Sequence, residues 1–150
     1  DVQDKKLQET LSKTCDNQPF INQAKMVLIF CADFQKWYDL FKYENCNLRK
    51  PAVGDLLLAT TDATIAAQNA VVAAESLGIG SCYIGDILEQ HDLHRKLLNL
   101  SEYVVPVCML VLGYPASDHF KRQKPKRCKL EDIVCVNQYH RKDKQELKYV

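Results

Sequence analysis

A glycine-rich segment, GIGSCYIGD, is the part of the sequence best suited to bind a flat ligand through its main chain. Gly78, Gly80 and Gly85 carry no Cβ, so backbone amides in this segment can approach a planar ring closely. A second interpretation is structural, because Gly78 falls where a helix is expected to end in a left-handed cap. The residues alone leave both interpretations open, and both describe the segment as a turn.

A basic cluster near the C-terminal end offers phosphate-binding chemistry. Its members are Lys121, Arg122, Lys124, Lys126 and Arg127. A guanidinium group binds phosphate through two parallel hydrogen bonds, and lysine binds it as a point charge. The alternative is a solvated charged run without a ligand. The formal charge of the whole chain is only +1, so the broad electropositive face that nucleic acid requires is not expected.

The remaining reactive residues form no catalytic or metal-binding pattern. His91 and His94 are close enough to share a helix face, but the sequence positions no third ligand beside them. Neither Ser76 nor Ser81 has the GxSxG context of a nucleophile. The 7 cysteines include no CxxC pair, so a zinc ribbon or a thioredoxin-type site is not predicted. Free cysteines favour a reducing, cytoplasmic location.

Two apolar runs predict the strands of the fold. Residues 26–32 (MVLIFCA) are continuously apolar, which favours a strand buried on both faces. Residues 103–112 predict a second strand, with Pro106 tolerated near its start or at a sheet edge. Because two strands do not make a stable sheet, the sequence is short of strands.

Helices are predicted between these strands. Residues 4–14 form a modest amphipathic helix, and residues 91–98 form a short helix with its leucines inward. Asp33 caps a helix whose aromatic residues recur at helical spacing and are expected in the core. These aromatic residues are Phe34, Trp37, Tyr38 and Phe41.

The clearest helix is expected to begin at the N-cap candidates Thr60, Thr61 and Asp62 and to run to Gly78. Its alanines make it slim on several faces, which is typical of a central helix or a dimer core. The loop before it, ENCNLRKPAVGD, contains Pro51 and Gly54 as breakers.

The composition is that of an ordinary globular protein. Of 150 residues, 47% are hydrophobic and 26% are charged, which suits one domain over residues 1–150. The longest apolar run, residues 104–112, is about half of the ~20 residues that a membrane-spanning helix needs. We therefore expect no membrane association. Helices alternating with strands predict an α/β or α+β sandwich.

Several segments in order resemble the nitroreductase family of FMN-dependent NAD(P)H oxidoreductases. The most specific is DATIAAQNAVVAAESLGIGSCYIG, which is similar to the family's dimer-core helix and glycine-rich turn. NQPFINQAKMVLIFCAD, YVVPVCMLVLGYPAS and KPKRCKLEDIV extend the resemblance over nearly all of residues 1–139. The resemblance implies an α+β sandwich whose mixed, mostly antiparallel sheet is flanked by helices. It also implies a homodimer with a long central helix and a C-terminal arm at about residues 128–150.

The resemblance further implies FMN as cofactor and NAD(P)H as co-substrate. Hydride would pass through flavin N5 to a nitroaromatic, a quinone or a similar small-molecule acceptor. By resemblance, Tyr83, Ile84, Gly85 and Asp86 would line the isoalloxazine ring, largely through their main chain. Lys124, Lys126 and Arg127 would hold the FMN phosphate, with Arg127 in the best register. No single acid or base is diagnostic of the family, so no catalytic residue is assigned.

The sequence departs from the family pattern at its start. Family members usually open with an RRSxR-like segment that grips the FMN phosphate, and residues 1–20 do not match it. Lys25 also stands where the family commonly has proline. We expect the chain to begin after that segment, which would account for the shortage of strands. The alternative function is a degenerate flavin-fold protein that binds or regulates without catalysis.

Overall fold

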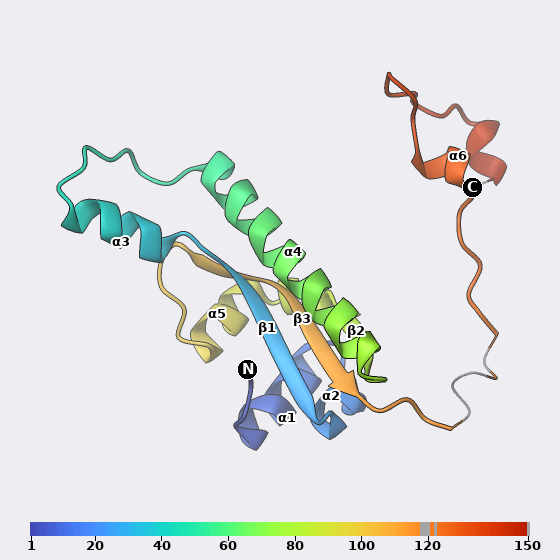
Figure 1. Ribbon diagram of the computed structural model, residues 1–150, viewed down its shortest axis with the longest axis horizontal. Helices are drawn as coiled ribbons and strands as arrows, with labels where there is room; N and C mark the ends of the chain where they lie inside the picture. Colours follow the sequence, from blue (N-terminus) through green and yellow to red (C-terminus); the bar gives the residue numbers. More distant parts are fainter. Residues whose placement is uncertain (118–120, 122, 150) are drawn as a thin grey trace. The chain divides into compact units, whose positions relative to one another are not determined.

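Three strands form one antiparallel sheet in the order β1-β3-β2 (Figure 1). The two apolar runs become β1 (Met26–Asp33) and the central strand β3 (Val104–Gly113), as predicted. The third strand, β2 (Gly80–Ile84), lies within the glycine-rich segment, so the prediction of a turn there was wrong. Pairing with the long strand β3 outweighs the weak strand tendency of its glycine and serine.

The computed structural model describes residues 1–117, 121 and 123–149. It consists of two compact units, Asp1–Pro115 and Ala116–Val150. The sheet belongs to the first unit, and each unit is described by itself.

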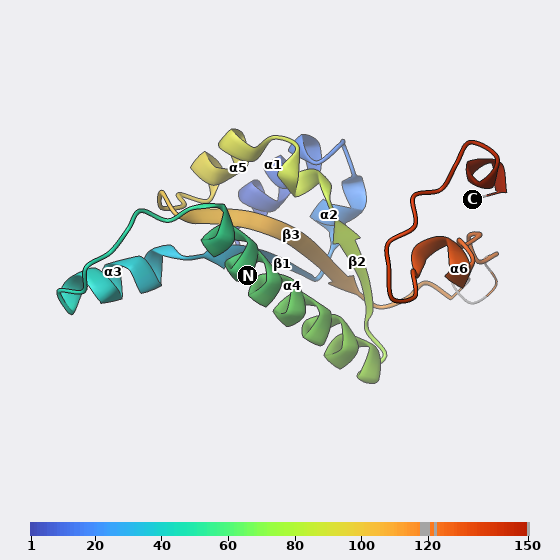
Figure 2. The same ribbon diagram turned by 90° about the horizontal axis from the view of Figure 1, so that it is seen from above.

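The sheet of the first unit is covered on both faces (Figure 2). One face carries α1 (Lys5–Thr14), α2 (Pro19–Gln23), the short 3-10 helix η1 (Asp86–Leu88) and α5 (His91–Leu97). The other face carries the single long helix α4 (Val53–Ser76). In the sequence, η1 follows the end of β2 after Gly85 alone. In space, this junction lies on the sheet face that α1 and α2 cover.

The main core lies between the sheet and the α1 layer. It consists of Leu11, Cys15, Ile21, Val27, Ile84, Ile87, Met109 and Val111. Because side chains alternate along a strand, Leu110 and Leu112 of β3 point to the opposite face, under α4. There the partners are small, since the buried residues of α4 are Ala63, Ala67 and Ala74.

Strand β1 is only half-buried over most of its length, not buried on both faces as predicted. It lies at the edge of the three-stranded sheet, where it pairs with β3 on one side only. Pro106 also differs from the prediction, because it sits in the central strand. The register shifts between Phe30 and Cys31, opposite Pro106, and such an irregularity tolerates a residue without an N–H group.

Helix α4 begins seven residues or more before the predicted caps. The cap at the start of α4 is formed by Asp55, whose carboxylate accepts a hydrogen bond from the Ala52 amide (2.8 Å). Arg49 holds the same carboxylate through its Nη2 (2.8 Å), which stabilises the first turn. Gly54 is therefore a helical residue and not a breaker.

The end of α4 agrees with the prediction. Gly78 has φ +71°, and its amide bonds to Glu75 while the Ile79 amide bonds to Ala74 (both 2.9 Å). This pair of bonds is the Schellman arrangement, in which glycine accommodates the left-handed residue.

The aromatic helix α3 (Gln35–Tyr43) contains no buried residue, so its predicted place in the core was wrong. Trp37 and Phe41 are 48% and 40% exposed. Trp37 and Phe41 pair with each other, with ring centroids 6.4 Å apart, and Tyr38 pairs with the ring of Tyr103, with centroids 5.2 Å apart. The predicted cap is present, since Asp33 accepts a hydrogen bond from the Lys36 amide (3.2 Å).

In α5 the buried residue is His94, whereas Leu93 is exposed. The prediction of inward leucines was wrong for Leu93, whereas Leu97 and Leu98 are half-buried. Hydrogen bonds at both ring nitrogens allow the imidazole to occupy the apolar layer.

The second unit contains α6 (Leu130–Ile133) and a terminal 3-10 helix, η3 (Glu146–Tyr149). Lys142 pairs with Asp132 (2.8 Å) and His140 with Glu146 (3.1 Å), and these contacts fold the segment onto itself. Leu130, Ile133 and Val136 remain largely exposed.

Candidate functional site

The predicted ring-binding residues form the junction between β2 and η1. The Ile84 side chain enters the core, where it is 2% exposed. The Tyr83 side chain points to the other face and donates a hydrogen bond from its hydroxyl to Gln68 Oε1 on α4 (3.2 Å). Gly85 follows, and Asp86 begins η1. Because the side chains of Tyr83 and Ile84 are engaged elsewhere, ligand contacts here would come mainly from the main chain.

Gly85 is the residue of this junction that the chain itself does not explain. Its φ of −78° is open to any residue, and a Cβ built on it would meet nothing within 4 Å. It lies at the surface. Neither conformation nor packing within the described residues therefore requires glycine, whereas a flat ring lying against this position would. The main chain at Gly85 is therefore open to the approach of a flat ring, which is compatible with an isoalloxazine ring there.

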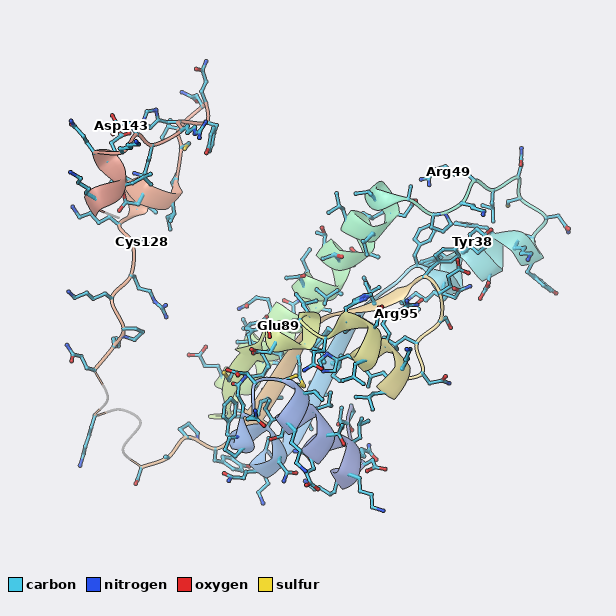
Figure 3. The ribbon with its side chains drawn as sticks, turned by 180° about the vertical axis from the view of Figure 1, so that it is seen from behind. Tyr38, Arg49, Glu89, Arg95, Cys128 and Asp143 are labelled. Atoms are coloured by element: carbon cyan, nitrogen blue, oxygen red, sulfur yellow. The ribbon has the colours of Figure 1, made fainter. Side chains whose placement is uncertain are left out.

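Two side chains from other elements hold the junction in place. Gln18 donates from Nε2 to Asp86 Oδ2 (3.0 Å) and to the Cys15 carbonyl (3.0 Å). His94 lies within hydrogen-bond distance of the Ile87 carbonyl through Nδ1 (2.7 Å) and of Thr14 Oγ1 through Nε2 (2.9 Å). Figure 3 shows this layer from the α1 side, with Glu89 marking the residue after η1 and Arg95 lying on α5. Nothing in the sequence signalled either contact.

The predicted phosphate-binding residues lie in the second unit. Lys124, Lys126 and Arg127 are exposed and belong to a stretch without helix or strand. Lys121 is exposed as well, whereas Arg122 lies outside the described residues. Their role as a phosphate grip stays a prediction.

Cysteine chemistry is disfavoured in the core of the first unit. Burial, followed by the nearby charge of Asp86, raises the pKa of the Cys15 thiol to about 11. Burial also raises the pKa of Cys31 and of Cys108. These thiols stay protonated near neutral pH and are poor nucleophiles. Among the described residues, no group of His, Cys, Asp and Glu side chains could hold a metal ion.

A family model described as "Nitroreductase family" matches residues 1–114. The chain belongs to the nitroreductase family. The family resemblance of the sequence, and the α+β fold expected from it, are thereby confirmed.

Curated relatives agree with this assignment. The chain is 38% identical over 129 residues to "FMN reductase [NAD(P)H]" of Bacillus subtilis, covering 82% of this chain and 50% of that protein. It is 35% identical over 146 residues to "Oxygen-insensitive NADPH nitroreductase" of Salmonella typhimurium, covering 97% and 58%. The nitroreductase family member described here thus spans between half and three fifths of the length of these relatives.

Solved structures share the fold. The "Structure of B. megaterium NfrA2" superposes with a TM-score of 0.86 at 37% identity, covering 98% of this chain and 59% of that one. The structure of "NfrA1 nitroreductase from B. subtilis" gives a TM-score of 0.87 at 27% identity, covering 99% and 60%.

Helix α4 has the length and composition of a membrane-spanning helix, whereas the longest apolar run of the sequence is too short for one. That similarity is weak evidence, because a central helix of a globular protein has the same length and composition.

Proposed function

We propose that this chain acts as an FMN-dependent NAD(P)H oxidoreductase that reduces nitroaromatics, quinones or similar acceptors. The observation that carries the proposal is Gly85, an exposed position where an added Cβ would meet nothing within 4 Å, so that the main chain is open to a flat ring. The names of the relatives, an FMN reductase and an NADPH nitroreductase, support the same chemistry.

The residues of this chain would bind and orient the cofactor. The main chain at Tyr83, Ile84, Gly85 and Asp86 would contact the ring, and hydrogen bonds from amides there would favour its reduced form. Lys124, Lys126 and Arg127 would hold the phosphate, Arg127 through two parallel bonds. When bound, FMN supplies the two-electron transfer chemistry that connects NAD(P)H with the acceptor.

A homodimer built on α4 is part of the proposal. Leu58, Ile65 and Val72 are each more than half exposed and follow one another at seven-residue spacing, so they form one stripe along the helix. The stripe lies on the side of α4 opposite to the buried alanines. A second copy would cover it, and the C-terminal arm at about residues 128–150 would embrace that copy. Seven free cysteines suit action in the reducing cytoplasm.

Titration of the full chain with FMN tests the function. Quenching of flavin fluorescence and a shifted visible absorbance are expected on binding, followed by NADPH or NADH oxidation that depends on an added quinone. Binding without oxidation would favour the non-catalytic alternative. If neither quenching nor oxidation is observed, the proposal is wrong for this chain.

A further inference from the structure

We propose that His94 and Gln18 are positioning residues that hold η1 so that the main chain of Gly85 and Asp86 faces the flavin ring. This proposal rests on the proposed function. Both residues act through the η1 turn, and neither needs to touch the cofactor. Gln18 lies 68 residues before Asp86 in the sequence. His94 lies seven residues after Ile87, and its other ring nitrogen reaches Thr14, 80 residues away.

The turn has little structure of its own. η1 contains three residues, and its internal backbone bonds are Leu88 N–H to the Gly85 carbonyl (2.9 Å) and Glu89 N–H to the Asp86 carbonyl (3.1 Å). Ile87 is fully buried and anchors the turn by packing. A turn this short leaves its carbonyls without the partners of a longer helix, so outside groups must fix its orientation.

His94 supplies one of those outside groups from the first turns of α5. Its side chain is fully buried, and a carbonyl can only accept, so Nδ1 carries the proton and donates to Ile87. The other ring nitrogen, Nε2, lies 2.9 Å from Thr14 Oγ1 and 3.9 Å from Cys15 Sγ, both at the end of α1. The imidazole therefore joins η1 to the end of α1 through two bonds made by one rigid ring.

Gln18 makes the second connection. Its own backbone is fixed to α1, because its amide bonds to the Ser12 carbonyl (2.9 Å) and its carbonyl accepts from Ser12 Oγ (2.8 Å). Its side chain then reaches the Asp86 carboxylate. Gln18 thus holds the carboxylate of Asp86, and the backbone amide of Asp86 directly follows Gly85. The two connections together fix both the first and the second residue of η1.

Three substitutions at one position separate the two bonds of His94. In His94→Asn the side-chain amide can replace Nδ1 and keep the bond to Ile87, whereas His94→Gln places its amide near Nε2 and keeps only the Thr14 side. His94→Leu removes both bonds. Gln18→Ala removes the contact with Asp86, and Gln18→Glu sets a second carboxylate against it.

Hydrogen exchange followed by mass spectrometry tests positioning without cofactor. In the full chain, residues 84–90 should exchange about tenfold faster in His94→Gln, Gln18→Ala and Gln18→Glu, which is the effect of losing one ordinary hydrogen bond. His94→Asn should stay within about threefold of the unsubstituted chain on the same scale. Residues 104–113 of β3 provide the internal reference and should not change. If His94→Leu fails to fold, the exchange rates of His94→Asn and His94→Gln still show whether His94 holds the turn.

Flavin binding gives the second measurement. The FMN dissociation constant should rise about tenfold in His94→Gln and stay close to its original value in His94→Asn. The flavin midpoint potential should shift in the Gln variant only. Unchanged exchange of residues 84–90 in His94→Gln, or equal damage by Asn and Gln, would overturn the positioning role. If the unsubstituted chain binds no FMN, the proposed function fails, whereas the exchange data still decide whether these residues hold the turn.

Discussion

At the scale of single residues, replacing Gly85 should separate the effect on FMN affinity from the effect on stability. In Gly85→Ala the added methyl meets open space and φ is unstrained, so the free energy of unfolding should change by less than about 0.5 kcal/mol. The same methyl would stand between the main chain and the ring, so FMN affinity should fall at least about tenfold. Urea denaturation and flavin fluorescence quenching measure the two effects. Equal FMN affinity in both proteins would remove the main support for ring binding here.

Arg127 is expected to bind the phosphate and not the ring. Arg127→Ala should weaken FMN binding by about tenfold or more, the usual effect of losing a charge-assisted hydrogen bond. Riboflavin lacks the phosphate, so its affinity should not respond. Arg141→Ala, an exposed arginine of the same unit, is the matched control. A similar loss for both flavins would indicate a general disturbance and contradict the phosphate role.

Some single-residue roles could be predicted from the sequence and others could not. The glycine-rich segment was visible because glycine spacing is a local signal. The contacts of Gln18 with Asp86 and of His94 with Thr14 were not, because they arise only when distant segments fold together. His94 in particular appeared in the sequence as half of a weak metal pattern, while the structure uses both ring nitrogens for hydrogen bonds to protein atoms.

At the scale of elements, long helices and continuous apolar strands were predictable and their limits were not. Helix α4 was evident from its uninterrupted alanines, and its end at Gly78 follows from a local rule. Its start depends on Asp55 reaching back to Arg49 and Ala52. Strand β2 was missed because its short, glycine-containing sequence becomes a strand only by pairing with β3. The aromatic residues of α3 were misplaced because burial depends on what covers a helix (Figure 3).

The start of α4 gives a pH prediction. The hydrogen bond from Arg49, and then that from the Ala52 amide, holds the pKa of Asp55 below its ordinary value of 3.8. A lowered folded-state pKa contributes stability above the unfolded-state pKa, and this contribution is lost as pH falls through the folded-state value. The unfolding free energy of the unsubstituted chain should therefore exceed that of Asp55→Asn at neutral pH. Urea denaturation series should show the difference shrinking below about pH 4, and a constant difference would contradict the assignment.

Two glycines at opposite ends of α4 should respond with opposite sign. Gly78→Ala places a methyl at φ +71° and should lower the free energy of unfolding by about 1 kcal/mol. Gly54→Ala lies in helical conformation with nothing within 4 Å of the new Cβ and should raise it by about 0.5–1 kcal/mol. Thermal denaturation of both variants measures the pair, and two changes of the same sign would contradict the described helix ends.

At the scale of the whole molecule, the stripe of Leu58, Ile65 and Val72 should decide the oligomeric state. Ile65→Asp leaves the sheet-facing alanines intact, so the helix should remain folded by circular dichroism. A buried, unpaired charge at a subunit interface is strongly unfavourable, so the proposed dimer should dissociate into monomers. Sedimentation velocity measures the change, with Asn22→Asp on the exposed side of α2 as control. If the unsubstituted chain sediments as a monomer at high concentration, the proposed dimer is wrong.

The outward side of β1 bears on how the protein behaves in concentrated solution. Within the described residues, β1 meets β3 on one side only, and its other side receives a hydrogen bond from the Val2 amide to the Val27 carbonyl (2.9 Å). The remaining backbone groups of an apolar, eight-residue strand are a template on which a further extended chain can add. Lys25 before the strand and Asp33 at its end place opposite charges at its limits. Such flanking charges oppose the in-register stacking of identical strands, so they act as gatekeepers against fibril formation.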